Sequence, residues 1–283
     1  MNSNLIETIK NTPVLGIGAP EIKQLKDLCG GKGLAGSDIF VCEGLWASEK
    51  LAALKIKIKE IFFCGDYYSS GSCPSVEARR LAEILPLAEK TYSISAKACA
   101  RVSDRDGADM CFITAEMPKR DIRNIPLADN MLIMILDGQE QPGNVGAILR
   151  SLDAAGGSFA IAVNLRTRIT HPRLIRSSLG AAFTLPFFEM SMDEVTRYLG
   201  DNGFRIVLTD LSASKNFCEI SAWGRVAVVA GNEHTGISPL WRELPNAEPV
   251  IIPMLGSVES LNVGFASTLV AYNIGLRQKG LMN

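Results

Sequence analysis

Residues 252–263 read Ile-Pro-Met-Leu-Gly-Ser-Val-Glu-Ser-Leu-Asn-Val, and they lead into a long apolar helix expected at Leu261–Arg277. A short strand is expected at Pro249–Ile252, so the glycine and serines that follow it predict a loop between strand and helix. Ser260 stands where a helix N-cap belongs. Asn262, by contrast, has little helix propensity inside an otherwise apolar helix start. A residue that breaks the local pattern in this way indicates a functional loop.

Two further loops upstream have the same character. One follows a strand expected at Val226–Ala230 and reads Gly-Asn-Glu-His-Thr-Gly over residues 231–236. The other, residues 137–144, follows an apolar strand expected at Met131–Leu136 and ends in Asn144, the expected N-cap of a helix to Ala155. We expect Arg150 to lie buried in the middle of that helix. Since ligands of parallel sheets bind where strands end at their carboxyl termini, these loops predict one binding edge.

The spacing of strands and helices predicts an α/β protein made of two modules. From residue 131 onward, buried strands of the parallel kind alternate with helices, which places helices on both faces of a sheet. Residues 38–114 alternate in the same way and predict a smaller α/β domain. Eleven of the thirteen lysines precede residue 128, and this change of composition sets a boundary within residues 118–129. We therefore predict domains at residues 1–125 and 126–283.

Composition excludes several classes of protein. The apolar runs of this 283-residue chain are too short to span a membrane, and its first ten residues do not resemble a secretory signal. Its seven cysteines include no Cys-x-x-Cys pair, which predicts neither a disulfide framework nor a cysteine-built zinc site, and favours a reducing cytoplasm. With only two histidines besides, we expect no metal. The loops also lack the glycine patterns of dinucleotide and phosphate-loop sites.

The stretch between Asp153 and Glu189 contains no acidic residue but carries four arginines, at positions 166, 168, 173 and 176. Two interpretations stand side by side. The arginines are ordinary solvated surface residues, or they form a patch for phosphate, which suits the planar guanidinium group. The neighbouring prolines predict that the stretch is presented as a loop and short helix outside the sheet.

Taken together and in order, the three loops resemble those of the SpoU/TrmH family of SPOUT-class RNA 2′-O-ribose methyltransferases. The shared patterns are Asn-x-Gly-x-Ile-x-Arg from Asn144, Gly-x-Glu-x-x-Gly from Gly231, and the segment 252–263. The first module is similar to the L30e-like RNA-binding domain of this family, through Phe-Val-Cys-Glu-Gly at residues 40–44 and the turn at residues 103–107. A basic run that often precedes that first strand is missing, since residues 30–33 read Gly-Gly-Lys-Gly.

The resemblance implies a trefoil-knotted C-terminal domain that holds S-adenosylmethionine, needs no metal and forms a homodimer through its catalytic domain, with the apolar helix 261–277 as interface. It also assigns residues. The implied catalytic residues are Arg150, Asn144, Glu233, Ser260 and Asn262; the implied cofactor contacts are Gly231, Ile252, Leu261 and Thr209; and the implied RNA contacts are Arg166 and Arg176. Because an arginine is hard to deprotonate, Arg150 acts either as base or as a cation that anchors phosphate.

Several alternatives remain at this point. Ribosomal RNA is favoured over transfer RNA, because an L30e-like domain accompanies ribosomal targets in similar enzymes of the thiostrepton-resistance type. A non-catalytic RNA-binding or ribosome-associated module is a second hypothesis. The presence of all the motif residues argues against it. A nicotinamide-dependent oxidoreductase is a third, but the chain lacks the glycine fingerprint, and Asn164 stands where an acidic residue is expected after the second strand.

Overall fold

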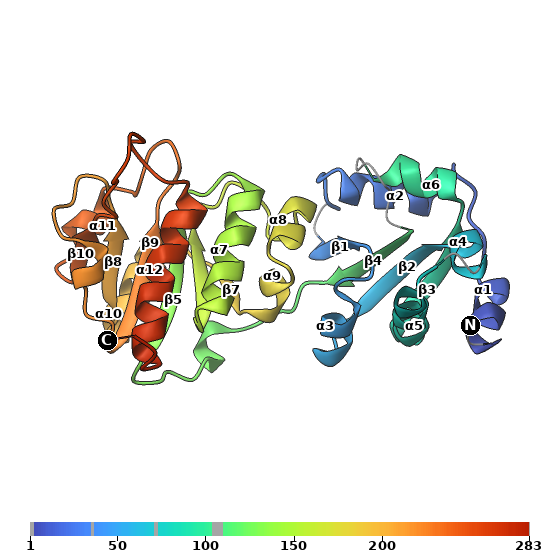
Figure 1. The fold of residues 1–283 in the computed structure, drawn as a ribbon, viewed down its shortest axis with the longest axis horizontal. Helices are drawn as coiled ribbons and strands as arrows, with labels where there is room; N and C mark the ends of the chain where they lie inside the picture. Colours follow the sequence, from blue (N-terminus) through green and yellow to red (C-terminus); the bar gives the residue numbers. More distant parts are fainter. Residues whose placement is uncertain (1–2, 35–36, 71–72, 104–109, 283) are drawn as a thin grey trace. The chain divides into compact units, whose positions relative to one another are not determined.

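The computed structural model describes residues 3–34, 37–70, 73–103 and 110–282 (Figure 1). Contacts group Met1–Pro118 with Thr170–Arg176 in one unit, and Lys119–Ile169 with Ser177–Asn283 in another. Both units are α/β, as predicted. Most of the turn expected at residues 103–107 lies outside the described residues. Within the described part of the chain, no helix has the length and apolar character needed to cross a membrane.

The first unit is built on a four-stranded sheet in the order β1-β4-β2-β3. β4 (Cys111–Glu116) lies antiparallel to both β1 (Ile39–Glu43) and β2 (Ile58–Cys64), and β2 pairs parallel with β3 (Ala88–Ile94). Its central strands, β4 and β2, are mostly buried, because helices cover both faces of the sheet (Figure 1).

The helices of this unit include one that the sequence did not predict. Residues before the first strand form α1 (Ser3–Asn11) and α2 (Pro20–Cys29), where we expected one short helix, and α2 places Ile22, Leu25 and Leu28 in the core. Ser95 caps α6 as predicted, accepting a hydrogen bond from the amide of Ala98 at 3.2 Å. The remaining helices are α3 (Ser48–Ala53), α4 (Gly65–Ser69), α5 (Ser75–Ile84), η1 (Leu85–Leu87), α6 (Ala96–Val102) and, by its contacts, α8 (Pro172–Ser177).

The second unit carries a six-stranded parallel sheet in the order β10-β8-β9-β5-β6-β7. Its central strand β5 (Met131–Asp137) is buried at every position. The other strands are β6 (Phe159–Val163), β7 (Phe187–Glu189), β8 (Arg205–Thr209), β9 (Arg225–Ala230) and β10 (Ala247–Val250). We did not predict β7, since three residues after Pro186 give too short a pattern to recognise.

Helices cover both faces of this sheet. α7 (Pro142–Ala154) and α12 (Val263–Gln278) pack together on one face (Figure 1). On the other, α10 (Met192–Asp201) and α11 (Leu240–Glu243) contribute Val195, Leu199 and Trp241 to the main core. A capping box between Ser191 and Glu194 starts α10. The remaining helices are α9 (Ala181–Thr184), η2 (Ile122–Asn124) and η3 (Phe217–Glu219).

The last helix is held between distant parts of the chain. α12 packs on α7, β5 and β9, and its C-terminal half also binds the connection between β8 and β9. Asn273 donates to the carbonyl of Phe217 at 2.9 Å, and Arg277 donates to that of Ile220 at 2.8 Å. The helix thus has the sheet as one neighbour and the β8–β9 connection as another. Threading of the chain into a trefoil knot stays a prediction.

Candidate functional site

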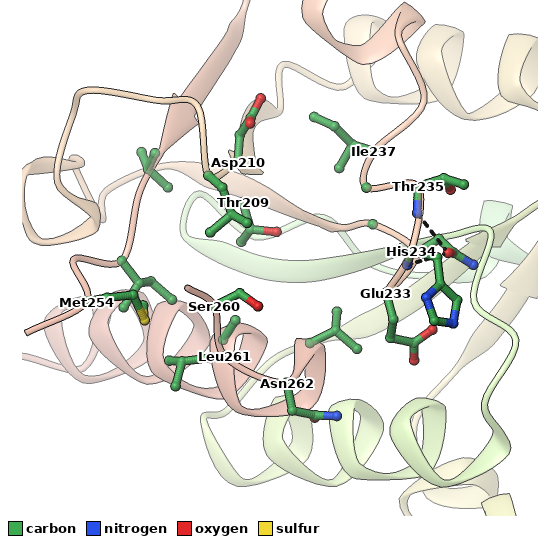
Figure 2. A pocket seen from close by; sticks show the side chains of 18 of the residues that line it. Thr209, Asp210, Glu233, His234, Thr235, Ile237, Met254, Ser260, Leu261 and Asn262 are labelled. Carbon is green, nitrogen blue, oxygen red and sulfur yellow. Dashed lines mark hydrogen bonds between the residues drawn. The ribbon is translucent and has the colours of Figure 1, made fainter. Parts of the chain in front are cut away.

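A cavity of about 500 Å³ lies at the carboxyl ends of β8, β9 and β10, the edge where the sequence predicts a binding site. All four predicted cofactor residues line it, as do three of the predicted catalytic residues: Thr209, Gly231, Glu233, Ile252, Ser260, Leu261 and Asn262. Figure 2 shows Met254 and Leu261 on one side of the cavity and Glu233 and His234 on the other. The motifs therefore meet in space although more than fifty residues separate Thr209 from Asn262.

The loop after β9 folds back on itself. The side-chain oxygen of Asn232 accepts hydrogen bonds from the amides of His234 at 2.8 Å and Thr235 at 3.2 Å, and the backbones of Asn232 and Gly236 exchange two more. A Cβ atom on Gly231 would lie 2.4 Å from the carbonyl carbon of Gly236 and 2.5 Å from the amide nitrogen of Ile237. Only glycine fits at that position.

Side-chain hydrogen bonds connect the three loops. The amide of Asn144 donates to one carboxylate oxygen of Glu233, and Asn262 donates to the side-chain oxygen of Asn144 at 3.3 Å. The second oxygen of Glu233 is buried and has no hydrogen-bond partner among the described residues. Asn144 therefore links the β9 loop to the start of α12.

Two N-cap predictions are wrong here. Asn144 is not an N-cap, because α7 begins at Pro142 with Gln141 in the N-cap position, three residues earlier than predicted. Proline at a first helical position explains the earlier start. Asn262, not Ser260, caps α12: its side chain accepts from the amide of Gly264 at 2.9 Å. The asparagine that looked misplaced inside a helix is therefore at its favoured boundary position.

Two buried residues that sequence reasoning missed support the β9 loop from the end of β5. Gln139 is fully buried and donates to the carbonyl oxygens of Ala230, at 3.3 Å, and Gly231, at 2.5 Å. Asp137 accepts from the amide of Ser238 at 2.6 Å and from the indole of Trp241 at 3.1 Å. Polar residues directly after a fully apolar strand were the available signal for both.

An ion pair forms another part of the cavity wall. Arg242 donates to Asp210 at 2.8 Å, and the amide and hydroxyl of Ser212 donate to the other carboxylate oxygen at 2.9 and 2.8 Å. Burial alone would raise the pKa of Asp210, but the hydrogen bonds from Ser212 and Arg242 hold it below its ordinary value. Beside it, the hydroxyl of Thr209 donates to the carbonyl of Val229 at 2.9 Å, which ties β8 to β9.

Arg150 is not where we expected it. The residue lies on α7 but is exposed rather than buried, and it is not among the residues that line the cavity. The face of α7 that carries Asn144 and Ser151 packs on α12. At 3.6 residues per turn, Arg150 lies about 100° to 120° around the helix from both of these residues. The cavity and Arg150 are thus separate features of this single chain.

The arginines of the acid-free stretch lie outside the sheet, as predicted. Arg166 is exposed in the loop after β6 and forms an ion pair with Glu140 at 2.6 Å. Arg176 is half-buried in α8. The two residues belong to different units of the chain. No group of three or more potential metal ligands occurs among the described histidines, cysteines and carboxylates.

Comparison with known proteins decides the family. Residues 131–272, half of the chain, match the model of the SpoU rRNA Methylase family. The chain belongs to this family. The matched region contains β5 through most of α12, including all the loops that form the cavity and the helix that carries Arg150. The family membership therefore covers the second unit.

Individual relatives extend the comparison. The chain is 34% identical over 170 residues to a 23S rRNA (uridine(2479)-2′-O)-methyltransferase of Streptomyces viridochromogenes, covering 58% of each chain. It is 37% identical over 150 residues to the 23S rRNA (guanosine-2′-O-)-methyltransferase RlmB of Bordetella pertussis, covering 53% of this chain and 61% of RlmB. These matches span less than two thirds of either relative. The crystal structure of an RNA 2′-O ribose methyltransferase superposes with a TM-score of 0.80 at 28% identity, over 95% of this chain and all of that one.

Proposed function

We propose that this protein is an S-adenosylmethionine-dependent methyltransferase that modifies a ribose 2′-hydroxyl of ribosomal RNA. The observation that carries the proposal is the meeting of Asn144, Glu233 and Asn262 beside a cavity lined by all four residues predicted to hold the cofactor. One relative is named as methylating a uridine of 23S rRNA and another a guanosine. They favour a ribosomal target, but they do not indicate which base the methylated nucleotide carries.

The cavity fits the cofactor in size and in chemistry. Its volume of about 500 Å³ falls within the range of roughly 300–1,000 Å³ that is usual for small-molecule sites. Ile252 and Leu261 provide apolar walls for an adenine ring, while Gly231 and its neighbours present backbone groups. The loop leaves no room for a Cβ atom at Gly231, so backbone can approach a ligand there. When bound, S-adenosylmethionine supplies a methyl group that is already activated by its sulfonium.

The remaining polar residues act on the substrate. Catalysis then requires that the ribose hydroxyl is positioned in line with the methyl group and that its proton is removed. Asn144 is fixed between Glu233 and Asn262, so it can orient the ribose, and Ser260 lies on the same loop as Asn262. We assign Arg150 the part of a cation that anchors a substrate phosphate, because it is exposed and lies outside the cavity lining.

Further RNA contacts come from outside the cavity. We assign Arg166 and Arg176 to phosphate binding, and the first unit, near residues 1–125, to holding the substrate RNA as an L30e-like domain. The ion pair of Arg166 with Glu140 is solvent-exposed and therefore weak enough to be exchanged for a phosphate. A ribosomal RNA substrate would support a cytoplasmic location.

We further propose a homodimer through the second unit. α12 leaves three large apolar side chains exposed on one stripe: Phe265 by 68%, Leu269 by 43% and Tyr272 by 37%. Neighbouring residues three or four apart lie on the same face of a helix, so this stripe is continuous. A two-fold axis beside α12 would place the same stripe of a second copy of the protein against this one and so bury both.

The function is tested by binding and by product analysis. Isothermal calorimetry should give one S-adenosylmethionine site per chain. Incubation of the protein with labelled cofactor and total RNA should then give label in 2′-O-methylnucleosides after nuclease digestion. Label found only in methylated bases, or no cofactor binding by the folded protein, would refute the proposal.

A further inference from the structure

Glu140 lies in the loop between β5 and α7 and contacts both a predicted RNA-binding arginine and the wall of the cavity. One of its carboxylate oxygens, Oε1, accepts a hydrogen bond from the guanidinium of Arg166 at 2.6 Å. The same oxygen accepts a second hydrogen bond, from the side-chain amide of Asn232 at 3.2 Å. Arg166 is exposed to solvent, whereas Asn232 lines the cavity. A single atom of Glu140 therefore joins the proposed RNA contact to the proposed cofactor site.

The buried side chain of Asn232 determines the shape of the β9 loop. Its oxygen accepts hydrogen bonds from the amides of His234 and Thr235, and its amide group donates to the carbonyl of Gly138 at 2.7 Å as well as to Glu140. An asparagine amide carries two hydrogens, one for each of these acceptors. Loss of the Glu140 carboxylate would therefore leave one of them without its protein partner and loosen the loop beside the cavity.

Backbone hydrogen bonds hold the loops after β5 and β6 together without help from the Glu140 carboxylate. The amide of Gly138 donates to the carbonyl of Val163 at 2.9 Å, and the amide of Arg166 donates to that of Gln139 at 3.0 Å. The side chain of Arg166 is nevertheless 68% exposed, against 36% for that of Glu140. The guanidinium can therefore exchange its carboxylate partner for a phosphate while the backbone around it stays in place.

We propose that Glu140 is a positioning residue that couples RNA binding to cofactor binding through Asn232; the inference rests on the function proposed above. A carboxylate oxygen next to a guanidinium is a weaker acceptor for a second donor, because the cation offsets part of its negative charge. When Arg166 turns to an RNA phosphate, the hydrogen bond from Asn232 to Glu140 strengthens and the β9 loop is held more firmly around the cofactor. Such coupling is reciprocal, so bound cofactor raises the affinity for RNA by the same factor.

The first measurement is calorimetric titration of the protein, without RNA, with S-adenosylhomocysteine, which lacks the reactive methyl group. Glu140→Ala should weaken binding by about 5- to 10-fold, since the loop loses a hydrogen bond. Glu140→Gln keeps an acceptor oxygen for Asn232 and should stay within about twofold of wild type. Arg166→Ala should bind about twofold more tightly, because Glu140 then serves Asn232 without the competing cation. A merely structural role of the ion pair predicts the opposite direction.

The second measurement is filter binding of labelled ribosomal RNA from cells that lack the gene, with and without saturating S-adenosylhomocysteine. Wild type should bind this RNA roughly two- to fivefold more tightly when the cofactor product is present, the range set by an exposed ion pair. Arg166→Ala and Glu140→Gln should bind it equally well in both conditions. Arg123→Ala is the matched control and should respond as wild type does, because it removes an exposed arginine from an ion pair of the same length, 2.6 Å to Asp121, outside the cavity lining.

The outcomes separate this inference from the proposed function. Unchanged cofactor affinity in Glu140→Ala, or weaker cofactor binding by Arg166→Ala, would overturn the positioning role of Glu140. A wild type whose RNA affinity does not respond to S-adenosylhomocysteine, or variants that keep the wild-type response, would overturn the coupling. In each of these cases a wild type that binds S-adenosylhomocysteine and forms 2′-O-methyl product leaves the methyltransferase function standing. A folded wild type that binds no S-adenosylhomocysteine would overturn both.

Discussion

Replacing Gly231 with alanine should damage the proposed cofactor site. The new Cβ atom would lie 2.4 Å from the carbonyl carbon of Gly236, 2.5 Å from the amide nitrogen of Ile237 and 2.7 Å from the carbonyl oxygen of Gly236. All three are backbone atoms, so no rotamer change can relieve the overlap. The β9 loop must shift as a whole.

The size of the effect follows from what the shift disturbs. Inserting a methyl group into a closely packed site costs typically 1–3 kcal/mol. Moving Gly231 also strains the 2.5 Å hydrogen bond that Gln139 donates to its carbonyl oxygen, worth roughly 1 kcal/mol. We therefore expect a total of about 2–4 kcal/mol, shared between the stability of the fold and cofactor binding. If the whole of this free-energy cost fell on cofactor binding, the affinity for S-adenosylmethionine would drop by roughly 30- to 1,000-fold.

The assay combines calorimetric titration with S-adenosylmethionine and urea denaturation of the free protein. Gly200→Ala is the matched control, since a Cβ atom at that position on α10 meets nothing within 4 Å. Alanine in a helix interior should leave cofactor binding unchanged and stabilise the fold slightly. If Gly231→Ala binds the cofactor as tightly as wild type and unfolds at the same urea concentration, the account of the β9 loop is wrong.

Four further predictions concern other parts of the protein. Asn144→Ala should lower the rate of methyl transfer by roughly 30-fold through the loss of two hydrogen bonds, and its effect should not add to that of Glu233→Gln in a double-mutant cycle. Phe265→Asp should halve the molar mass measured by light scattering; an unchanged mass would exclude α12 as the interface. Arg176→Ala should make the salt dependence of RNA binding shallower by roughly 0.7–0.9, measured by filter binding. Because its folded pKa is depressed, Asp210 stabilises the fold above its ordinary pKa of 3.8 and loses this contribution as the pH falls further; the stability difference between wild type and Asp210→Asn in urea should therefore shrink from pH 6 to pH 3.

Local patterns in the sequence predicted much of the second unit. Fully apolar strands such as β5 and β9 are recognisable because helices cover both faces of a parallel sheet. The three loops were placed at one edge because strands of a parallel sheet end on the same side. The cavity contains residues of two of these loops, and the hydrogen bonds of Gln139 and Asn144 join the loop after β5 to them.

Other features depend on contacts that no local pattern contains. The start of α7 was misplaced by three residues and that of α12 by two. Each boundary region offers more than one residue that suits a helix start, and the fold decides between them. Burial of Arg150 was inferred from its apolar neighbours in sequence, yet its position on the helix circumference points it away from the packed face. The support of Gly231 by Gln139 joins residues 92 positions apart, so only the tertiary structure reveals it.

Mapping of ribose methylation tests the central claim most directly. Ribosomal and transfer RNA would be isolated from cells with and without the gene, and from deletion cells that express wild type or the Asn144→Ala variant. We predict that one 2′-O-methylated nucleotide of ribosomal RNA disappears on deletion, returns with wild type and stays reduced with the variant. Identical 2′-O-methylation of both RNA classes with and without the gene would contradict the account.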